Sequence, residues 1–194
     1  MMVLDVENLK DAKITLTLVF INFFCFILST FAVPDVLLFF AQINRNIIEN
    51  LELWRLFTSM FLHGDPMHIF SNMIALLLFG ATVETNKNIS KIQYLIIYFV
   101  SGLIGNLFSL LLLPLDTVSV GASGAIFGLI GVAFIIVAMD YQPLLLFSLF
   151  YIGFFIITSF APGINYWAHL FGLLGGVLFG YLFYSRKRKI ISPY

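Results

Sequence analysis

Polar side chains are rare inside the apolar stretches of this sequence, and the few that occur are types that catalyse acyl transfer. His68 and Asn72 stand near the start of one apolar stretch, Ser123 near the start of another and His169 near the start of the last. Serine is a weak nucleophile at neutral pH unless a nearby base removes its proton, and His169 is the histidine of another late stretch at matching depth. We therefore predict that Ser123 and His169 form a nucleophile–base pair.

The same layer offers hydrogen-bond donors for the negative charge that develops on a carbonyl oxygen during acyl transfer. His68 and Asn72 are four residues apart, which places them on one helix face, and Asn72 cannot titrate. The backbone amide of Ser123 lies at the start of a helix, where N–H groups have no helical partner. No apolar stretch holds Asp or Glu in its interior, so we expect a dyad rather than a triad.

Small residues flank the serine and follow the histidine, in Gly-Ala-Ser-Gly and in a GxxxG spacing. They are Gly121, Gly124, Gly172 and Gly176, with Gly180 at the same interval. Glycines at this spacing let two membrane helices approach closely. We expect the last helix to seat His169 tightly against the helix that begins near Ser123.

The composition requires a membrane to position these residues. Hydrophobic residues make up 61% of the 194 residues, and charged residues only 10%, against about 25% in soluble domains. Too few polar residues remain to cover a surface that faces water, so the chain is predicted to be a polytopic membrane protein. The formal net charge is zero and no basic segment is present to neutralise phosphates, which excludes nucleic acid as a partner.

Six apolar stretches are long enough to cross a bilayer as helices, at about 20 residues each. We predict a single domain over residues 1–194, an all-α bundle of six transmembrane helices. The first stretch lacks a small-x-small cleavage site, so it is expected to be retained rather than removed as a signal peptide. The long connection 34–65 is expected to be an ordered excursion at the outer membrane surface. The predicted helices are 14–33, 66–83, 92–113, 120–139, 144–160 and 166–184.

The distribution of Lys and Arg predicts the orientation, because positively charged loops stay in the cytoplasm. Arg45 and Arg55 lie on one side of the predicted bundle, and eight basic residues lie on the other: Lys10, Lys13, Lys87, Lys91, Arg186, Lys187, Arg188 and Lys189. Both termini are therefore predicted to be cytoplasmic. The early residues of the second, fourth and sixth helices then lie near the outer leaflet, so we expect a multi-pass plasma-membrane protein with its site on the extracytoplasmic side.

In its ordered set of motifs the chain resembles the rhomboid family of intramembrane serine proteases, in its minimal six-helix form. The motifs are Trp54-Arg55, His68-x-x-x-Asn72, Gly80-Ala81-Thr82-Val83-Glu84, Gly121-Ala122-Ser123-Gly124 and Ala168-His169-x-x-Gly172-x-x-x-Gly176. The resemblance implies a Ser123 nucleophile, His169 as base and then acid, and His68 and Asn72 beside the oxyanion. It also implies transmembrane substrates cut near their outer end, no metal or cofactor, and a loop around Trp54-Arg55 in the outer leaflet.

One position departs from the family pattern. Bacterial members often carry a tyrosine one turn after the serine, stacked on the histidine, where this chain has Phe127. The ring can still stack without the phenol, so the orientation of the histidine is expected to depend on packing alone. Of the remaining polar residues, His63 is expected to brace the turn into the second helix, Trp54 and Arg55 to anchor the long loop, and Glu84 to make a structural contact at the inner end.

Two rival interpretations stay open. Three histidines at one depth permit a metal site, although no HExxH pair is present, and a zinc requirement for activity would support that interpretation. The chain could also be a rhomboid-like protein that binds transmembrane helices without cutting them, although such proteins usually lack the serine or the histidine. The sequence leaves undecided the physiological substrate, the oligomeric state, and whether the fifth helix or the loop 34–65 moves aside for substrate.

Overall fold

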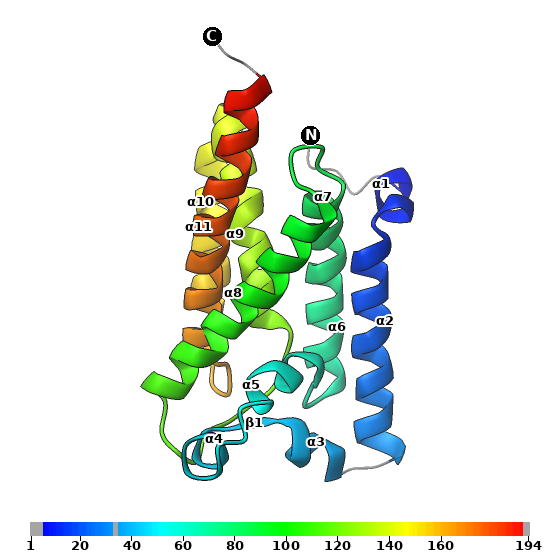
Figure 1. The fold of residues 1–194 in the computed structure, drawn as a ribbon, viewed down its shortest axis with the longest axis vertical. Helices are drawn as coiled ribbons and strands as arrows, with labels where there is room; N and C mark the ends of the chain where they lie inside the picture. Colours follow the sequence, from blue (N-terminus) through cyan, green and yellow to red (C-terminus); the bar gives the residue numbers. More distant parts are fainter. Residues whose placement is uncertain (1–5, 33–34, 192–194) are drawn as a thin grey trace.

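The chain folds into a bundle of helices, most of which run roughly along one axis, while α8 (Lys91–Leu112) crosses the bundle obliquely (Figure 1). The computed structural model describes residues 6–32 and 35–191. Val33 and Pro34, where the sequence predicts the end of the first span and the start of the long loop, lie outside the described residues. Five of the described helical segments are long and apolar enough to cross a membrane: Lys13–Phe31, Pro66–Glu84, Lys91–Leu112, Ser123–Asp140 and Tyr166–Tyr184.

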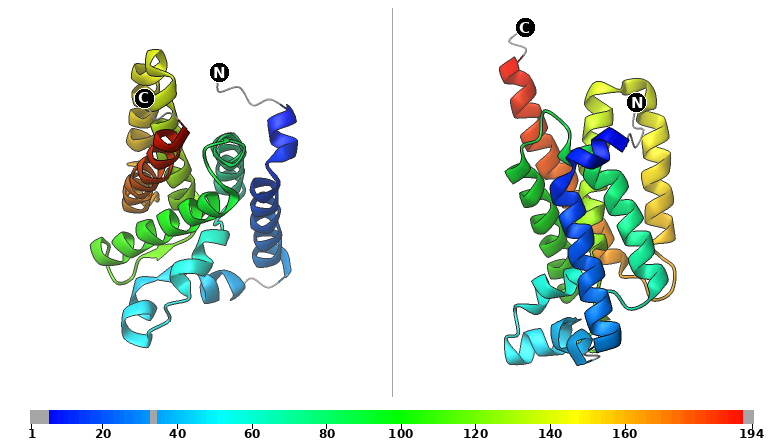
Figure 2. Two further views of the ribbon diagram at one scale, coloured as in Figure 1. Left: turned by 45° about the horizontal axis from the view of Figure 1, so that its top comes forward. Right: turned by 90° about the vertical axis from the view of Figure 1, so that its right-hand side faces the viewer.

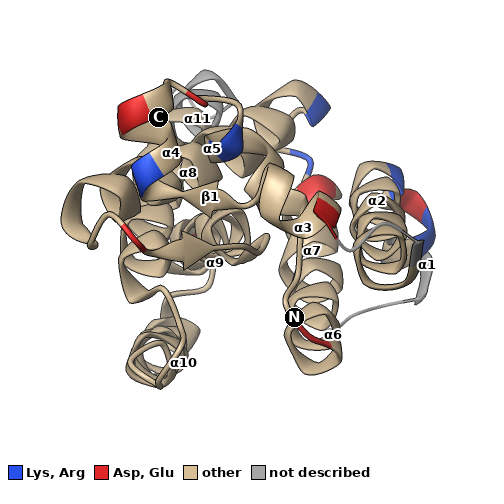
Figure 3. Ribbon diagram, turned by 90° about the horizontal axis from the view of Figure 1, so that it is seen from below, with Lys and Arg blue, Asp and Glu red and all other residues tan. Residues whose placement is uncertain are grey.

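The segment predicted as the fifth of the six spans is shorter than the other five. It comprises a 3-10 turn, η4 (Gln142–Leu144), and the helix α10 (Leu145–Thr158). None of the described side chains of α10 is buried, and the helix lies at the edge of the bundle (Figure 3). The structure therefore has five full-length candidate spans and one shorter apolar helix in the region that it describes.

The first two spans each change helix type along their length. The first consists of α2 (Lys13–Ile27) and a π-helical turn, η1 (Leu28–Ala32), after the short α1 (Val6–Asp11). The second consists of α6 (Pro66–Ala75), a π-helical turn, η3 (Leu76–Gly80), and α7 (Ala81–Glu84). Asp65 caps α6 by accepting a hydrogen bond from the amide of His68 at 2.8 Å, and Pro66 is well placed in the first turn because it lacks an N–H.

Glu84 joins the ends of three helices, α2, α7 and α8, which confirms the predicted structural contact. Its carboxylate accepts hydrogen bonds from the amides of Ile14, at 3.0 Å, and Thr15, at 2.7 Å, in the first turn of α2. It also pairs with Lys91 Nζ at 2.9 Å, at the start of α8 (Lys91–Leu112). An acidic group at a helix N-terminus satisfies free N–H groups and complements the helix dipole.

The helix α9 (Ser123–Asp140) packs against both α8 and α11 (Tyr166–Ile191), which also pack against each other; two further views show the bundle (Figure 2). Every residue from Gly124 to Ala133 is buried, which suits a helix that is apolar on all sides. The helix begins at Ser123 and not at Val120 as predicted, because Gly121 adopts a positive φ of 130° that ends the preceding strand and cannot belong to a helix.

The loop that follows the first span is folded and held to the bundle, at the end opposite α1 and the end of α11 (Figure 1). Its helices are α3 (Asp35–Phe40), α4 (Asn44–Asn50), α5 (Arg55–Thr58) and the 3-10 turn η2 (Ser59–Phe61). Between them, β1 (Gln42–Ile43) pairs antiparallel with β2 (Val118–Ser119), just before Gly121. This pairing links the loop directly to the approach to Ser123.

Arg55 holds the loop together from within. Its guanidinium is buried, donates hydrogen bonds to the carbonyls of Leu38 and Ala41 at 2.7 and 2.8 Å, and forms an ion pair with Glu52. Trp54 remains half-exposed with its ring stacked on that of Phe39. These contacts hold the loop in shape, and the anchoring of the loop at the membrane interface by Trp54 and Arg55 stays a prediction.

Candidate active site

Ser123 and His169 meet at the N-terminal ends of α9 and α11. Ser123 Oγ lies 2.7 Å from His169 Nε2, within hydrogen-bond distance. Ser123 is the first residue of α9, so its backbone amide has no helical carbonyl to bond, and His169 stands in the first turn of α11. The pair has the geometry of a nucleophile hydrogen-bonded to its base.

Backbone contacts between glycines set the distance between the two helices. A methyl group on Gly172 would overlap the carbonyl oxygen of Gly124, and a methyl on Gly176 would overlap that of Gly128. These contacts confirm the close packing that the glycine spacing predicts. Because Gly124 follows Ser123 directly and Gly172 lies one turn after His169, the same contact that packs the helices also positions the pair.

The imidazole of His169 is held on two further sides. The ring of Phe127 stacks on it, with centroids 4.3 Å apart and planes 13° from parallel. Its Nδ1 lies 2.7 Å from the hydroxyl of Ser159, which is buried directly after α10. The expectation that packing alone orients the histidine is therefore wrong, because a hydrogen bond contributes as well.

Ser159 is the residue that sequence reasoning missed. It ends an apolar helix ten residues before His169, across the short turn 160–165. A serine at the C-terminal end of the preceding apolar helix shares the depth of the histidine near the start of the next, and that depth is the signal that could have indicated it. The side chain of Ser159 is short, and it reaches the imidazole because the turn folds back tightly.

Asn72 and His68 approach the pair from the second span. The Asn72 side chain is buried, and its Nδ2 donates to the carbonyl of His68 at 2.9 Å while its Oδ1 has no partner among the described residues. A Cβ placed on Gly121 would lie 2.9 Å from His68 Nε2 and 3.7 Å from Ser123 Oγ. Gly121 therefore leaves open a space that both groups border, and any larger residue would fill it.

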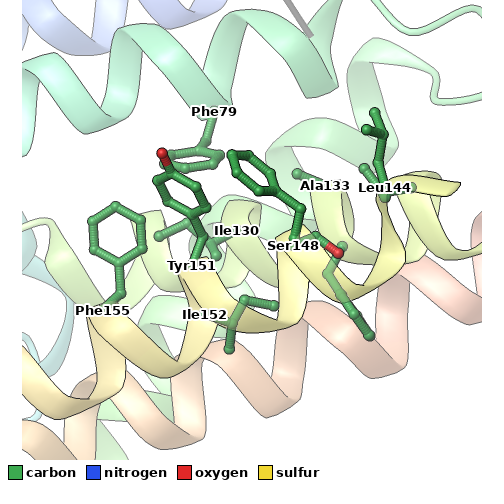
Figure 4. Close-up of a pocket in the computed structure, with 11 residues that line it drawn as sticks. Phe79, Ile130, Ala133, Leu144, Ser148, Tyr151, Ile152 and Phe155 are labelled. Atoms are coloured by element: carbon green, nitrogen blue, oxygen red, sulfur yellow. The ribbon is translucent and has the colours of Figure 1, made fainter. Parts of the chain in front are cut away.

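A pocket of about 240 Å³ contains the pair and Asn72. Its other polar lining residues are Ser71, Thr158 and Ser159. A second, apolar cavity of about 310 Å³ adjoins it between α9, α10 and η3, with Ile130 and Phe155 lining both (Figure 4). Phe79 from η3 and Tyr151 from α10 face each other across that cavity (Figure 4).

His63 lies beside the site and not in the pocket with the pair. Its ring is buried against that of His68, with centroids 5.0 Å apart, and neither ring nitrogen has a hydrogen-bond partner within the described part of the chain. Burial, together with the charge of His68, lowers the pKa of His63 to about 3, while Asp65 acts in the opposite direction. Residues 6–32 and 35–191 contain no group of three His, Cys, Asp or Glu side chains arranged to hold a metal ion.

Comparison with known proteins agrees with the motifs. Residues 50–186 match the family model of the Rhomboid domain, and this match covers more than half of the chain. The chain belongs to the rhomboid family. As a rhomboid with several apolar helices, it is a multi-pass membrane protein.

Among the relatives of this rhomboid, one is named as a protease and another is named as inactive. A Bacillus subtilis protein, "Putative rhomboid protease YdcA", is 37% identical over 150 residues, which cover 73% of each chain. "RHOMBOID-like protein 1" from Arabidopsis thaliana is 34% identical over 73% of this chain but only 37% of its own length. "Inactive RHOMBOID-like protein 8", also from Arabidopsis thaliana, is 31% identical over 67% of this chain and 38% of its own. The family therefore does not by itself decide whether this member is active.

Proposed function

We propose that this rhomboid is a serine endopeptidase that cleaves transmembrane segments of other membrane proteins with a Ser123–His169 dyad. The observation that carries the proposal is the 2.7 Å contact between Ser123 Oγ and His169 Nε2 inside a pocket. The Asp and Glu residues needed for an aspartyl mechanism are missing from the interiors of the spans. The proposed chemistry needs no metal or cofactor.

The mechanism follows from the positions of the side chains. Ser123 Oγ attacks the carbonyl carbon of the scissile bond while His169 Nε2 takes the hydroxyl proton. Asn72, His68 and the amide of Ser123 donate to the oxyanion, each contributing on the order of 3 kcal/mol by analogy with other oxyanion holes. His169 then gives its proton to the leaving amine, and water hydrolyses the acyl-enzyme.

The orientation of the protein supports a site near the outer membrane surface. We propose six membrane helices, with α10 as the fifth, both termini in the cytoplasm, and a location in the plasma membrane. Eight basic residues against two favour this orientation, and α1 and the end of α11 lie at the end of the bundle opposite α3, α4 and α5. Ser123 follows β2, which pairs with the loop, and this supports the proposal that the pocket lies near the extracytoplasmic side.

Substrate is proposed to enter beside α10 rather than past the loop 35–65. The described side chains of α10 are all at least partly exposed. The loop, in contrast, is held to the bundle by the β1–β2 pairing, by Gln42, whose Nε2 donates to the carbonyl of Asn106 at 3.1 Å, and by Arg45, which contacts Asp116 at 2.8 Å. Moving the loop would break many bonds to buried groups, and moving α10 would break few. The apolar cavity under α10 continues from the pocket and suits the part of a substrate segment deeper in the membrane.

The test is labelling of the purified protein in detergent with a fluorophosphonate, together with cleavage of a generic transmembrane substrate in vesicles. Wild type is expected to be labelled and to cleave, and Ser123→Ala and His169→Ala to do neither while staying folded. Ser29→Ala is the matched control, because Ser29 is a buried serine on η1 whose hydroxyl donates to the carbonyl of Phe26, one turn earlier in the same span. Cleavage that survives in Ser123→Ala would refute the assignment of the nucleophile.

The second candidate function is that of a rhomboid that binds transmembrane helices without cutting them. The observation that favours it is the similarity to a relative whose name says that it is inactive. Under this candidate, wild type would bind a transmembrane peptide but would neither react with the fluorophosphonate nor release products. The same experiment therefore separates the two candidates.

A further inference from the structure

The hydroxyl of Ser159 makes two hydrogen bonds that together determine where its proton lies. Its Oγ is 2.8 Å from the carbonyl oxygen of Phe155 and 2.7 Å from His169 Nδ1. A carbonyl can only accept a hydrogen bond, so the single hydroxyl proton of Ser159 is directed to Phe155. The oxygen of the hydroxyl is then free to accept, and Nδ1 of His169 is left as the donor.

We propose that Ser159 is a positioning residue that holds His169 in the tautomer protonated at Nδ1. In that tautomer Nε2 carries the lone pair, and Nε2 is the atom that faces Ser123 Oγ at 2.7 Å. The opposite tautomer would place a proton on Nε2 and could not accept the hydroxyl proton. Ser159 thereby orients the imidazole and fixes its tautomer, as an aspartate does in a catalytic triad, but without a negative charge. This role presupposes the proposed Ser123–His169 peptidase.

The same bond strengthens as the reaction proceeds. When His169 takes the proton of Ser123, the imidazole becomes positively charged and its Nδ1–H becomes a charge-assisted donor to Ser159, which is roughly twice as strong as a neutral one. Removing the hydroxyl should therefore slow the chemical step rather than weaken substrate binding. We expect kcat to fall about tenfold, a change of about 1.4 kcal/mol in the barrier.

The position of Ser159 also connects the base to α10. Ser159 is buried directly after a helix whose described side chains are all at least partly exposed. Phe155, whose carbonyl accepts the hydrogen bond from Ser159, lines both the pocket and the apolar cavity. Its ring packs edge-on against that of Phe127, with centroids 6.4 Å apart. The orienting bond therefore exists only while the outer end of α10 is docked against the site.

The experiment compares Ser159→Ala with Ser159→Thr and with the control Ser29→Ala. Each variant is assayed for fluorophosphonate labelling rate, kcat and KM on a transmembrane substrate, and thermal unfolding. Nitrogen NMR of ¹⁵N-histidine-labelled protein adds the tautomer of His169, assigned by the signal that is missing in His169→Ala. This spectroscopic measurement does not depend on turnover.

We expect Nδ1 to be protonated in wild type. We also expect Ser159→Ala to lose that preference and about tenfold in labelling rate and kcat, with KM and unfolding temperature close to those of Ser29→Ala. Ser159→Thr, which keeps the hydroxyl, should retain most of the activity. A wild-type His169 protonated at Nε2, or a Ser159→Ala variant with unchanged tautomer and rate, would overturn the proposal. If wild type shows the Nδ1 tautomer but neither labels nor cleaves, the peptidase assignment fails while the hydrogen-bond role of Ser159 stands.

Discussion

Replacing Gly172 with alanine tests whether backbone contact between α9 and α11 sets the geometry of the pair. The added methyl would lie 2.9 Å from the carbonyl carbon and 3.2 Å from the Cα of Gly124, and closer still to the carbonyl oxygen. All three are backbone atoms, which cannot turn aside as a side chain can. The two helices must therefore separate at the turn that carries Ser123 and His169.

The size of the effect follows from those distances. Ordinary carbon contacts are about 3.5–4.0 Å, so relief of the overlap requires a separation of about 1 Å. The 2.7 Å contact between Ser123 and His169 would lengthen by a similar amount, beyond hydrogen-bond distance. A displacement of this size at reacting atoms costs about a hundredfold in rate, and overpacking costs about 1–3 kcal/mol of stability.

Gly175→Ala is the matched control on the same helix. The atoms nearest to a methyl there would be Ser101 Oγ at 3.3 Å, Ile104 Cδ1 at 3.4 Å and Ser101 Cα at 3.5 Å, so a shift of a few tenths of an ångström in the Ser101 side chain relieves the contact. Cleavage rate and thermal unfolding of both variants are measured in the same detergent. We expect Gly175→Ala to stay close to wild type and Gly172→Ala to lose about a hundredfold in kcat and several degrees in unfolding temperature. Equal behaviour of the two variants would refute the reasoning.

Two further predictions concern the second span and the loop before it. Asn72→Ala is expected to lower kcat about a hundredfold with little change in KM, because the lost donor acts on the oxyanion; an unchanged rate on a transmembrane substrate would limit Asn72 to packing. For His63, the pKa of about 3 in the folded protein lies below its ordinary 6.5, so the unfolded chain binds a proton that the folded protein does not. Its contribution to stability is present above pH 6.5 and is lost as the pH falls, by about 1.4 kcal/mol per unit, or about 2 kcal/mol at pH 5. The free energy of unfolding, measured from pH 7 to pH 5, should therefore change less in His63→Phe than in wild type. An equal change in the two proteins would contradict the argument that burial lowers the pKa of His63.

Much of the bundle could be predicted from the sequence because its signals are local or periodic. Apolar length indicates a membrane span regardless of its neighbours, and Pro66 marks a helix start through its own backbone. The glycines at positions 172 and 176 predicted a close helix contact because a spacing of four places them on one face. These features require no knowledge of the chain elsewhere.

The features that could not be predicted depend on the conformation of turns. The start of α9 at Ser123 depends on the positive φ of Gly121, and the sequence does not reveal which of several glycines adopts it. The bond between Ser159 and His169 depends on the turn 160–165, and the bonds of Arg55 to Leu38 and Ala41 depend on how the loop folds over itself. Long-range bonds between polar groups leave no periodic trace in a sequence.

The parts of the candidate site therefore differ in how firmly they are held. The distance from Ser123 to His169 is set by contacts between glycine backbones on α9 and α11, which are buried at the centre of the bundle. The imidazole is held by stacking on Phe127 of α9 and by the hydrogen bond to Ser159, which lies at the end of a helix with little buried surface. A substrate that displaces α10 would leave the distance and the stacking unchanged but would break the hydrogen bond that holds the tautomer. His169 would then act as a base only after α10 returns. While the pocket is open and water can enter, the site would not be able to carry out the reaction.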